Sequence, residues 1–121
     1  MIIGIGIDSL RIERMERAIQ RETFVNKVFT AKEREYLKKR TLAAQSAAGI
    51  FCAKEAVLKA FSMGITDAAL TDIEILHNEN GAPYVLLHGG IGRDTALYIS
   101  ITHTEDTASA FAVLEKEEHI K

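Results

Sequence analysis

Several features that mark particular classes of protein are absent from this chain of 121 residues. It has one cysteine, so no internal disulfide can form, and the apolar residues around Cys52 predict a buried thiol without a catalytic role. No apolar run approaches the roughly 18 residues that a membrane span needs. The first residues lack the basic region, long apolar core and cleavage site of a signal peptide. These absences predict a cytoplasmic protein with no membrane partner.

An excess of charge of one sign is also absent. The chain has 15 Lys and Arg against 17 Asp and Glu, a formal net charge of −2, whereas nucleic-acid-binding proteins usually show a broad basic excess. We therefore expect no nucleic-acid partner. Aromatic residues make up only 7% of a chain that is 47% apolar, so the core should consist mostly of Ile, Leu, Val and Ala. The length predicts a single domain over residues 1–121.

Hydrophobic periodicity predicts an α+β fold in which the helices are segregated from a largely antiparallel sheet. We expect helices at 9–21, 31–40 and 42–62, and strands at 1–7, 72–76, 84–87, 97–103 and 108–114. Thr30 and Glu33 form a capping box for the second helix, and Gly64 is a suitable stop for the third. The segment 78–81 predicts a hairpin turn. The glycines at 89, 90 and 92 form no phosphate loop, because no Gly-Lys-Ser/Thr sequence follows them.

Three charged residues are candidates for a catalytic site. Glu55 and Lys59 are four residues apart in a helical run and therefore share one helix face. Asp8 follows the first strand, whose glycines allow another backbone or a ligand to come close. Two carboxylates and an ammonium could hold a hard cation and a phosphate. From the residues alone, Asp8 could equally cap the next helix, and Glu55 and Lys59 could form a surface ion pair worth under about 1 kcal/mol.

Basic residues gather at two further places. Arg14, Arg17 and Arg21 lie on the side of the first predicted helix opposite its apolar residues. They could form a solvated face among neighbouring glutamates or a docking strip for an acidic protein. The segment 38–40 (Lys-Lys-Arg) ends the second helix, where cations interact favourably with the helix C-terminus or could reach the phosphates of a nucleotide.

Five separated motifs resemble those of the holo-acyl-carrier-protein synthases, a family of 4′-phosphopantetheinyl transferases, in their order and spacing. They are Gly4-Ile5-Gly6-Ile7-Asp8, Phe29-Thr30-Ala31-Lys32-Glu33, the block from Phe51 to Lys59, Asn80-Gly81-Ala82-Pro83 and Ser100-Ile101-Thr102-His103-Thr104. The resemblance runs nearly end to end. It implies transfer of the 4′-phosphopantetheine group from coenzyme A to a serine of apo acyl carrier protein, with release of 3′,5′-ADP, in fatty acid biosynthesis.

The resemblance also implies roles for individual residues. Asp8 and Glu55 match the ligands of Mg²⁺, and Lys59 matches the lysine at the coenzyme A phosphates. His103, with Thr104, becomes a coenzyme A contact, although a lone histidine is more often structural. The arginine strip becomes the carrier-protein dock. A homotrimer with active sites between neighbouring subunits is implied, and the general base stays open between a carboxylate and a water that a carboxylate orients.

Departures from the family pattern concern coenzyme A binding. Ile50 stands where the family usually has a basic residue, Ser62-Met63-Gly64 replaces a glycine-rich turn, and Ala82 replaces a lysine. Without a cation at position 50, coenzyme A could bind more weakly, or the 38–40 segment or Lys54 could take over that task. Two other classes of function are compatible with the residues: a non-catalytic adaptor that binds an acidic protein, and a regulator that binds coenzyme A without turning it over.

Overall fold

A computed structural model describes residues 1–62 and 69–117. The expected stop at Gly64 and the departure at Met63 lie outside these residues. The elements in chain order are β1 (Ile2–Arg11), α1 (Ile12–Ala18), α2 (Glu22–Val28), α3 (Ala31–Lys38), α4 (Ala43–Ala60), the 3-10 helix η1 (Leu70–Asp72), β2 (Ile73–His77), β3 (Pro83–Leu87), β4 (Thr95–His103) and β5 (Thr107–Lys116).

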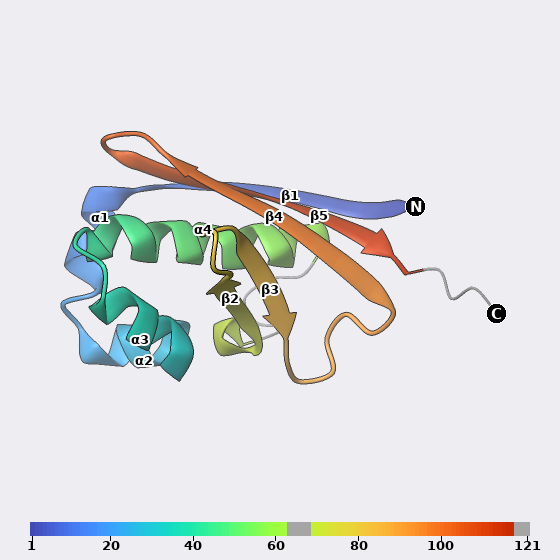
Figure 1. Ribbon diagram of the computed structural model, residues 1–121, viewed down its shortest axis with the longest axis horizontal. Helices are drawn as coiled ribbons and strands as arrows, with labels where there is room; N and C mark the ends of the chain where they lie inside the picture. The colour runs from blue at the N-terminus through green and yellow to red at the C-terminus, as the bar shows by residue number, and fades with distance from the viewer. Residues whose placement is uncertain (63–68, 118–121) are drawn as a thin grey trace.

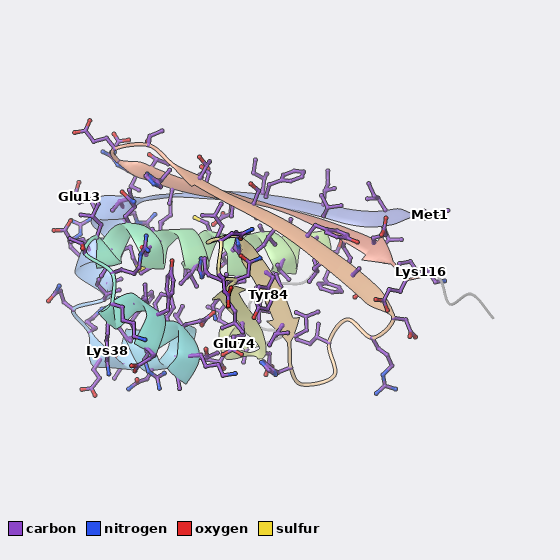
Figure 2. All side chains as sticks on the ribbon, in the orientation of Figure 1. Met1, Glu13, Lys38, Glu74, Tyr84 and Lys116 are labelled. Atoms are coloured by element: carbon purple, nitrogen blue, oxygen red, sulfur yellow. The ribbon has the colours of Figure 1, made fainter. Side chains whose placement is uncertain are left out.

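Both sheets are antiparallel, which confirms the predicted α+β class. The larger sheet has the strand order β1-β5-β4, so the first strand pairs with the last described strand, and β2 and β3 form a separate hairpin. Figure 1 shows α4 running along one face of the three-stranded sheet, with α2, α3 and the hairpin beyond it and α1 beside one end of it. In Figure 2, Glu13 of α1 and Lys116 of β5 lie at opposite ends of the molecule.

The close approach of β1 to α4 requires two glycines. A Cβ atom at Gly4 would overlap the carbonyl oxygen of Ala60, and one at Gly6 would overlap that of Ala56. Strand and helix backbones can therefore touch only where side chains are absent. The buried residues of α4 are mostly small, and its alanines pack against Ala108, Ala110 and Ala112 of β5 in the core.

The opposite face of the three-stranded sheet is not covered by any described element (Figure 1). Large apolar side chains project from it and are 41–61% exposed: Ile3, Ile5, Ile7, Tyr98 and Phe111. The strand register places these side chains on one face, because residues that pair directly point to the same side of a sheet. Ile5 pairs with Val113, which pairs with Tyr98, and Ile7 pairs with Phe111. Patches of this kind usually mark interaction surfaces.

The predicted first helix, 9–21, was wrong at its start and at its end. β1 continues to Arg11 because Leu10 and Arg11 still pair with β5, so the helix begins only at Ile12 and ends at Ala18. The separate helix α2 was missed. Its β-branched residues weaken the helical signal in the sequence, whereas Val28 is buried in the core, so packing stabilises a helix that propensity does not indicate.

The remaining elements agree with the sequence to within a few residues. The capping box is confirmed, because Thr30 Oγ1 accepts from the Glu33 amide at 3.2 Å and Glu33 Oε1 accepts from the Thr30 amide at 2.8 Å. The hairpin turn is also confirmed, with Gly81 at a φ of 88° and its amide bonded to the Asn78 carbonyl. The buried thiol of Cys52 is confirmed as well.

Candidate active site

β1 and α4 bring Asp8 and Lys59 together. Lys59 Nζ lies 3.3 Å from Asp8 Oδ1 and donates to the Ile7 carbonyl oxygen at 2.9 Å. The Lys59 side chain is 54% exposed, so its ammonium remains accessible from solvent. The lysine therefore pairs with the carboxylate of β1, and the surface ion pair with Glu55 that its helical spacing allows does not form.

Glu55, one helical turn before Lys59, completes a charged cluster (Asp8, Glu55 and Lys59). Partial burial raises the pKa of the Glu55 carboxyl above its ordinary value of 4.5, and the negative charge of Asp8 raises it further, while Lys59 opposes the shift. Two carboxylates that repel each other in this way are stabilised together by a cation. The cluster thus has the electrostatics of a cation site.

Asp8 does not cap the following helix. The residue before α1 is Arg11, which makes no side-chain cap bond, and Asp8 itself lies three residues earlier in paired strand, opposite Ala110. The structure thus removes the main structural explanation for this carboxylate. Asp8 instead faces the helix that carries Glu55 and Lys59.

A groove of about 590 Å³ leads away from the two carboxylates. Its lining includes Asp8 and Glu55 at one end and the side chains of all three predicted docking residues, Arg14, Arg17 and Arg21. Met15, Phe24 and Phe51 supply an apolar surface in the same groove, and the Arg21 guanidinium lies 5.8 Å from the centre of the Phe24 ring. The sequence does not single out the two phenylalanines, because Phe24 lies in the missed helix and Phe51 stands out only as part of a motif.

His103 lies in a different pocket, of about 250 Å³. Gln45 and Ser46 of α4, Tyr36 and Arg40 line this second pocket with it, as do Gly81 and Pro83 of the hairpin. The Gln45 Nε2 and His103 Nε2 atoms are 3.1 Å apart, and His103 Nδ1 lies 3.3 Å from the Thr104 carbonyl oxygen. Gln45 and the Thr104 carbonyl group thus hold the His103 ring from both of its nitrogen atoms.

Arg40 is the basic side chain that the second pocket offers. Its Nε donates to Ser46 Oγ at 3.3 Å, and its guanidinium lies 5.4 Å from the centre of the Tyr36 ring. The same ring stacks on His77, with the ring centres 4.2 Å apart. Burial lowers the pKa of His77, and Arg40 lowers it further, so a neutral imidazole lies beside the cation. The sequence does not indicate this setting for His77.

The structure does not bring His103 and Thr104 into the Asp8–Glu55–Lys59 cluster of the same chain. β1 and β4 are opposite edges of the sheet, and α4 packs against both, so the groove and the second pocket lie on different flanks of α4. Thr104 Oγ1 donates to Asp106 and accepts from the Thr107 amide within the β4–β5 turn. Lys54 is excluded as a substitute for a cation at position 50, because it is fully buried.

The donor set of the cluster fits Mg²⁺. No group of three or more Asp, Glu, His or Cys side chains suited to a metal occurs among the described residues, so the protein would supply two carboxylates from Asp8 and Glu55. Mg²⁺ is commonly held by one or two carboxylates and keeps waters and substrate phosphate oxygens as its other ligands. A closed metal cage, by contrast, would need more side chains than the cluster has.

Comparison with known proteins places the chain in a family. The model of the 4′-phosphopantetheinyl transferase superfamily matches residues 4–114. A holo-[acyl-carrier-protein] synthase from Clostridium perfringens is 44% identical over 97% of this chain and 96% of its own length. The holo-(acyl-carrier-protein) synthase of Bacillus anthracis, solved in complex with CoA (3′,5′-ADP), is 32% identical and superposes with a TM-score of 0.86 over 97% of this chain and 99% of that one.

A second solved relative leads to the same family. The Helicobacter pylori holo-[acyl-carrier-protein] synthase, in complex with coenzyme A, is 30% identical, with a TM-score of 0.84 over 92% of this chain and 99% of that one. The chain therefore belongs to the 4′-phosphopantetheinyl transferase superfamily and, within it, to the holo-[acyl-carrier-protein] synthases. Over residues 1–62 and 69–117, no helix is long and apolar enough to cross a membrane.

Proposed function

We propose that the chain works as a holo-[acyl-carrier-protein] synthase through Asp8, Glu55 and Lys59. The reaction transfers 4′-phosphopantetheine from coenzyme A to a serine of apo acyl carrier protein. The serine oxygen attacks the phosphorus that bears the pantetheine arm, the bond to the bridging pyrophosphate oxygen breaks, and 3′,5′-ADP leaves with that electron pair. The observation that carries the proposal is that Asp8 and Glu55 line a groove together with three arginines, while Lys59 pairs with Asp8.

The cluster addresses the negative charge of the reactants. A Mg²⁺ ion held by Asp8 and Glu55 would supply positive charge at the pyrophosphate oxygens. The exposed ammonium of Lys59 can donate to a phosphate oxygen and stabilise charge on the leaving group. The serine proton passes to a carboxylate or to a water that a carboxylate orients. Glu55 is one candidate for this base, because burial raises the pKa of its carboxyl.

The groove would hold the carrier protein. Residues 11–40 contain ten of the 15 Lys and Arg but only five of the 17 Asp and Glu, and three of those basic residues, Arg14, Arg17 and Arg21, line the groove. Such a field attracts an acidic partner and speeds its association. The rim of Arg14, Arg17 and Arg21 can pair with carboxylates, while the rings of Phe24 and Phe51 offer apolar contact near the reacting serine.

The second pocket would hold the nucleotide part of coenzyme A, with His103 in its wall. Arg40 shares this pocket with Ile50, so its guanidinium can make the phosphate contact that the family usually gives to a basic residue at position 50. Ser46 and Tyr36 hold Arg40 in place, which lowers the entropy lost when it binds a phosphate. The basic end of α3 therefore serves a ligand in this proposal.

A homotrimer with shared active sites agrees with the separation of the two pockets. The second pocket of one subunit and the charged cluster of the next would form one site, and the uncovered sheet face would be buried between copies. We expect light scattering to give three times the mass of one chain, and Ile5→Glu to dissociate the assembly and abolish activity. A fully active monomer at the assay concentration would refute the shared site.

The direct test is incubation with apo acyl carrier protein, coenzyme A and Mg²⁺, followed by intact mass. We expect the carrier protein to gain one phosphopantetheine group, and omission of Mg²⁺ with a chelator present to prevent the gain. Binding of coenzyme A without a gain in mass would favour the regulator. Binding of carrier protein alone would favour the adaptor. The proposal includes a cytoplasmic location and service to fatty acid biosynthesis.

A further inference from the structure

A buried ion pair lies in the core next to the active-site residues of α4. Lys54 and Glu33 are both fully buried, and Lys54 Nζ lies 2.7 Å from Glu33 Oε1. The ammonium also donates to the carbonyl oxygens of Val28 and Leu70, each at 2.8 Å. All three of its hydrogens therefore have acceptors. Burial lowers the pKa of Lys54, and the Glu33 carboxylate opposes that shift.

The partners of this ion pair come from four separate segments. Glu33 accepts from the Thr30 amide through Oε1 and from the Ile75 amide through Oε2, at 2.8 and 2.7 Å. Lys54 therefore connects α4 to the end of α2 at Val28, to the start of α3, to η1 and to β2. Glu74, labelled in Figure 2, extends the network because it accepts from Thr30 Oγ1 at 2.5 Å. The Lys54–Glu33 ion pair thus joins the end of α2, the start of α3, η1 and β2 to α4 through hydrogen bonds.

α4 needs such a contact because much of its packing surface is smooth. Six of the eleven buried residues of this helix are alanine or glycine (Ala47, Ala48, Gly49, Ala53, Ala56 and Ala60), whereas Ile50, Val57 and Leu58 are its larger buried apolar side chains. Small residues allow close approach but resist sliding and rotation weakly. A hydrogen-bonded ion pair, by contrast, is satisfied at one position and one rotation of the helix.

We propose that Lys54 is a positioning residue that sets the rotation and the axial position of α4, so that Glu55 and Lys59 point at Asp8. Glu55 follows Lys54 directly and points about 100° away around the helix axis. A shift of α4 by about 1 Å would therefore displace both active-site side chains, and misplacement of that size can cost about 10²-fold in rate. The inference rests on the proposed roles of Asp8 and Glu55.

A purely structural role makes a different prediction. Replacing a buried ion pair by neutral residues often leaves stability unchanged, whereas removing one partner strands a charge and destabilises the fold. With a purely structural role, removing both charges would restore activity together with stability. Positioning requires that activity stay low even when stability returns.

The test compares Lys54→Met with the double variant Glu33→Gln/Lys54→Met. Lys54→Met should lower the melting temperature or prevent folding, because Glu33 keeps a buried charge. The double variant has no buried charge, and its glutamine oxygen can still accept from a backbone amide. We expect its melting temperature to recover most of the loss. We also expect kcat to stay at least tenfold below the parent, with a nearly unchanged KM for carrier protein.

Binding of Mn²⁺, followed by the electron paramagnetic resonance of the free ion, gives a readout that needs no turnover. The double variant should bind Mn²⁺ at least fivefold more weakly than the parent. Two controls are matched to the double variant. Lys27→Met makes the same change at an exposed lysine, and Ile73→Val weakens the core without touching the ion pair. Neither control should change kcat or Mn²⁺ binding at temperatures below its melting temperature.

The outcomes distinguish the positioning role of Lys54 from the assignment of Asp8 and Glu55 to the metal site. Parental kcat and Mn²⁺ affinity in the double variant, with a loss of Mn²⁺ binding in Glu55→Gln, would overturn the positioning role alone. Parental Mn²⁺ affinity in Glu55→Gln would overturn the site assignment and the positioning role with it. A double variant that is stable but impaired in both readouts supports the inference.

Discussion

Lys59 Nζ and Asp8 Oδ1 lie 3.3 Å apart although 51 positions separate the two residues in the sequence. The contact joins α4 to β1 and exists because β1 docks closely on the helix. An exposed ion pair of this kind adds little stability. The contact matters for the site, because the packing of β1 on α4 that forms it also brings Asp8 near Glu55. The site is therefore a product of long-range packing, and its predictions test that packing as well as its chemistry.

We expect Asp8→Asn and Glu55→Gln each to fold and to lose about 10²-fold or more in kcat, comparable to the loss of one electrostatic stabiliser of a transition state. Each change replaces an anionic oxygen ligand by a neutral one of the same shape. Steady-state rates at saturating Mg²⁺ measure the effect. Glu13→Gln, at an exposed position of α1, is the control and should keep full activity. Near-normal rates in both site variants would refute the assignment.

Gly6→Ala should abolish activity and lower the melting temperature sharply. Its Cβ would overlap the Ala56 carbonyl oxygen, which belongs to the helix backbone and cannot rotate away. β1 must then move off α4 and take Asp8 with it. Thermal unfolding and rate measurements on the same preparation test this. Ser9→Ala, on the exposed side of the same strand, is the matched change, because it removes a hydrogen bond to Ser109 Oγ but adds no atom between β1 and α4. A stable and active Gly6→Ala protein would show that the strand can relocate without harm.

Reversal of two arginines, Arg14→Glu/Arg17→Glu, should raise the KM for carrier protein at least tenfold and leave that for coenzyme A nearly unchanged. Both side chains line the groove and neither lines the second pocket. Added salt should raise the same KM in the parent, because exposed charge pairs are screened. Arg93→Glu makes the same kind of change at an exposed site outside both pockets. Equal damage to both substrates would indicate a structural role for the strip.

The raised pKa of Glu55 predicts that metal-free stability and Mn²⁺ binding change in opposite directions with pH. Between the ordinary value of 4.5 and the raised value, the folded state holds more protons than the unfolded state, so metal-free stability falls as pH rises through that window. Metal-free Glu55→Gln should therefore melt higher than the parent at pH 7, and the difference should disappear below about pH 4.5. Mn²⁺ binding requires the deprotonated carboxylate. On acidification, the parent should therefore lose Mn²⁺ at a higher pH than it would if Glu55 had an ordinary pKa. Equal melting of the two proteins at pH 7 would contradict the raised pKa.

Local signals in the sequence are sufficient for most elements and for the chemistry of the cluster. The capping box of Thr30 and Glu33 is predicted correctly because its cause is confined to four residues. The pairing of Glu55 with Asp8 is suggested by family resemblance, and the glycines of β1 indicate only that something comes close. That α4 is what comes close depends on tertiary contacts that no local pattern carries.

Other features depend on packing and were missed. α2 forms because Val28 and its neighbours are buried, despite weak helix propensity. The groove contains Phe24 because this helix exists. The sequence suggests Lys54 as a spare cation for coenzyme A, since a lysine in an alanine-rich helix gives no sign of its partners. Its burial arises from Glu33, 21 positions earlier, and from two backbone carbonyls.

The pairing of β1 with β5 has a consequence for synthesis of the chain. Asp8 is held opposite Ala110, so the strand that carries one half of the acidic cluster leaves the ribosome about one hundred residues before its pairing partner. A nascent chain that has completed α4 already contains Asp8, Glu55 and Lys59 but has no central strand to dock them. The enzyme can therefore become active only after β5 has emerged, and a translation product that stops after β4 should bind neither Mn²⁺ nor carrier protein in a productive way.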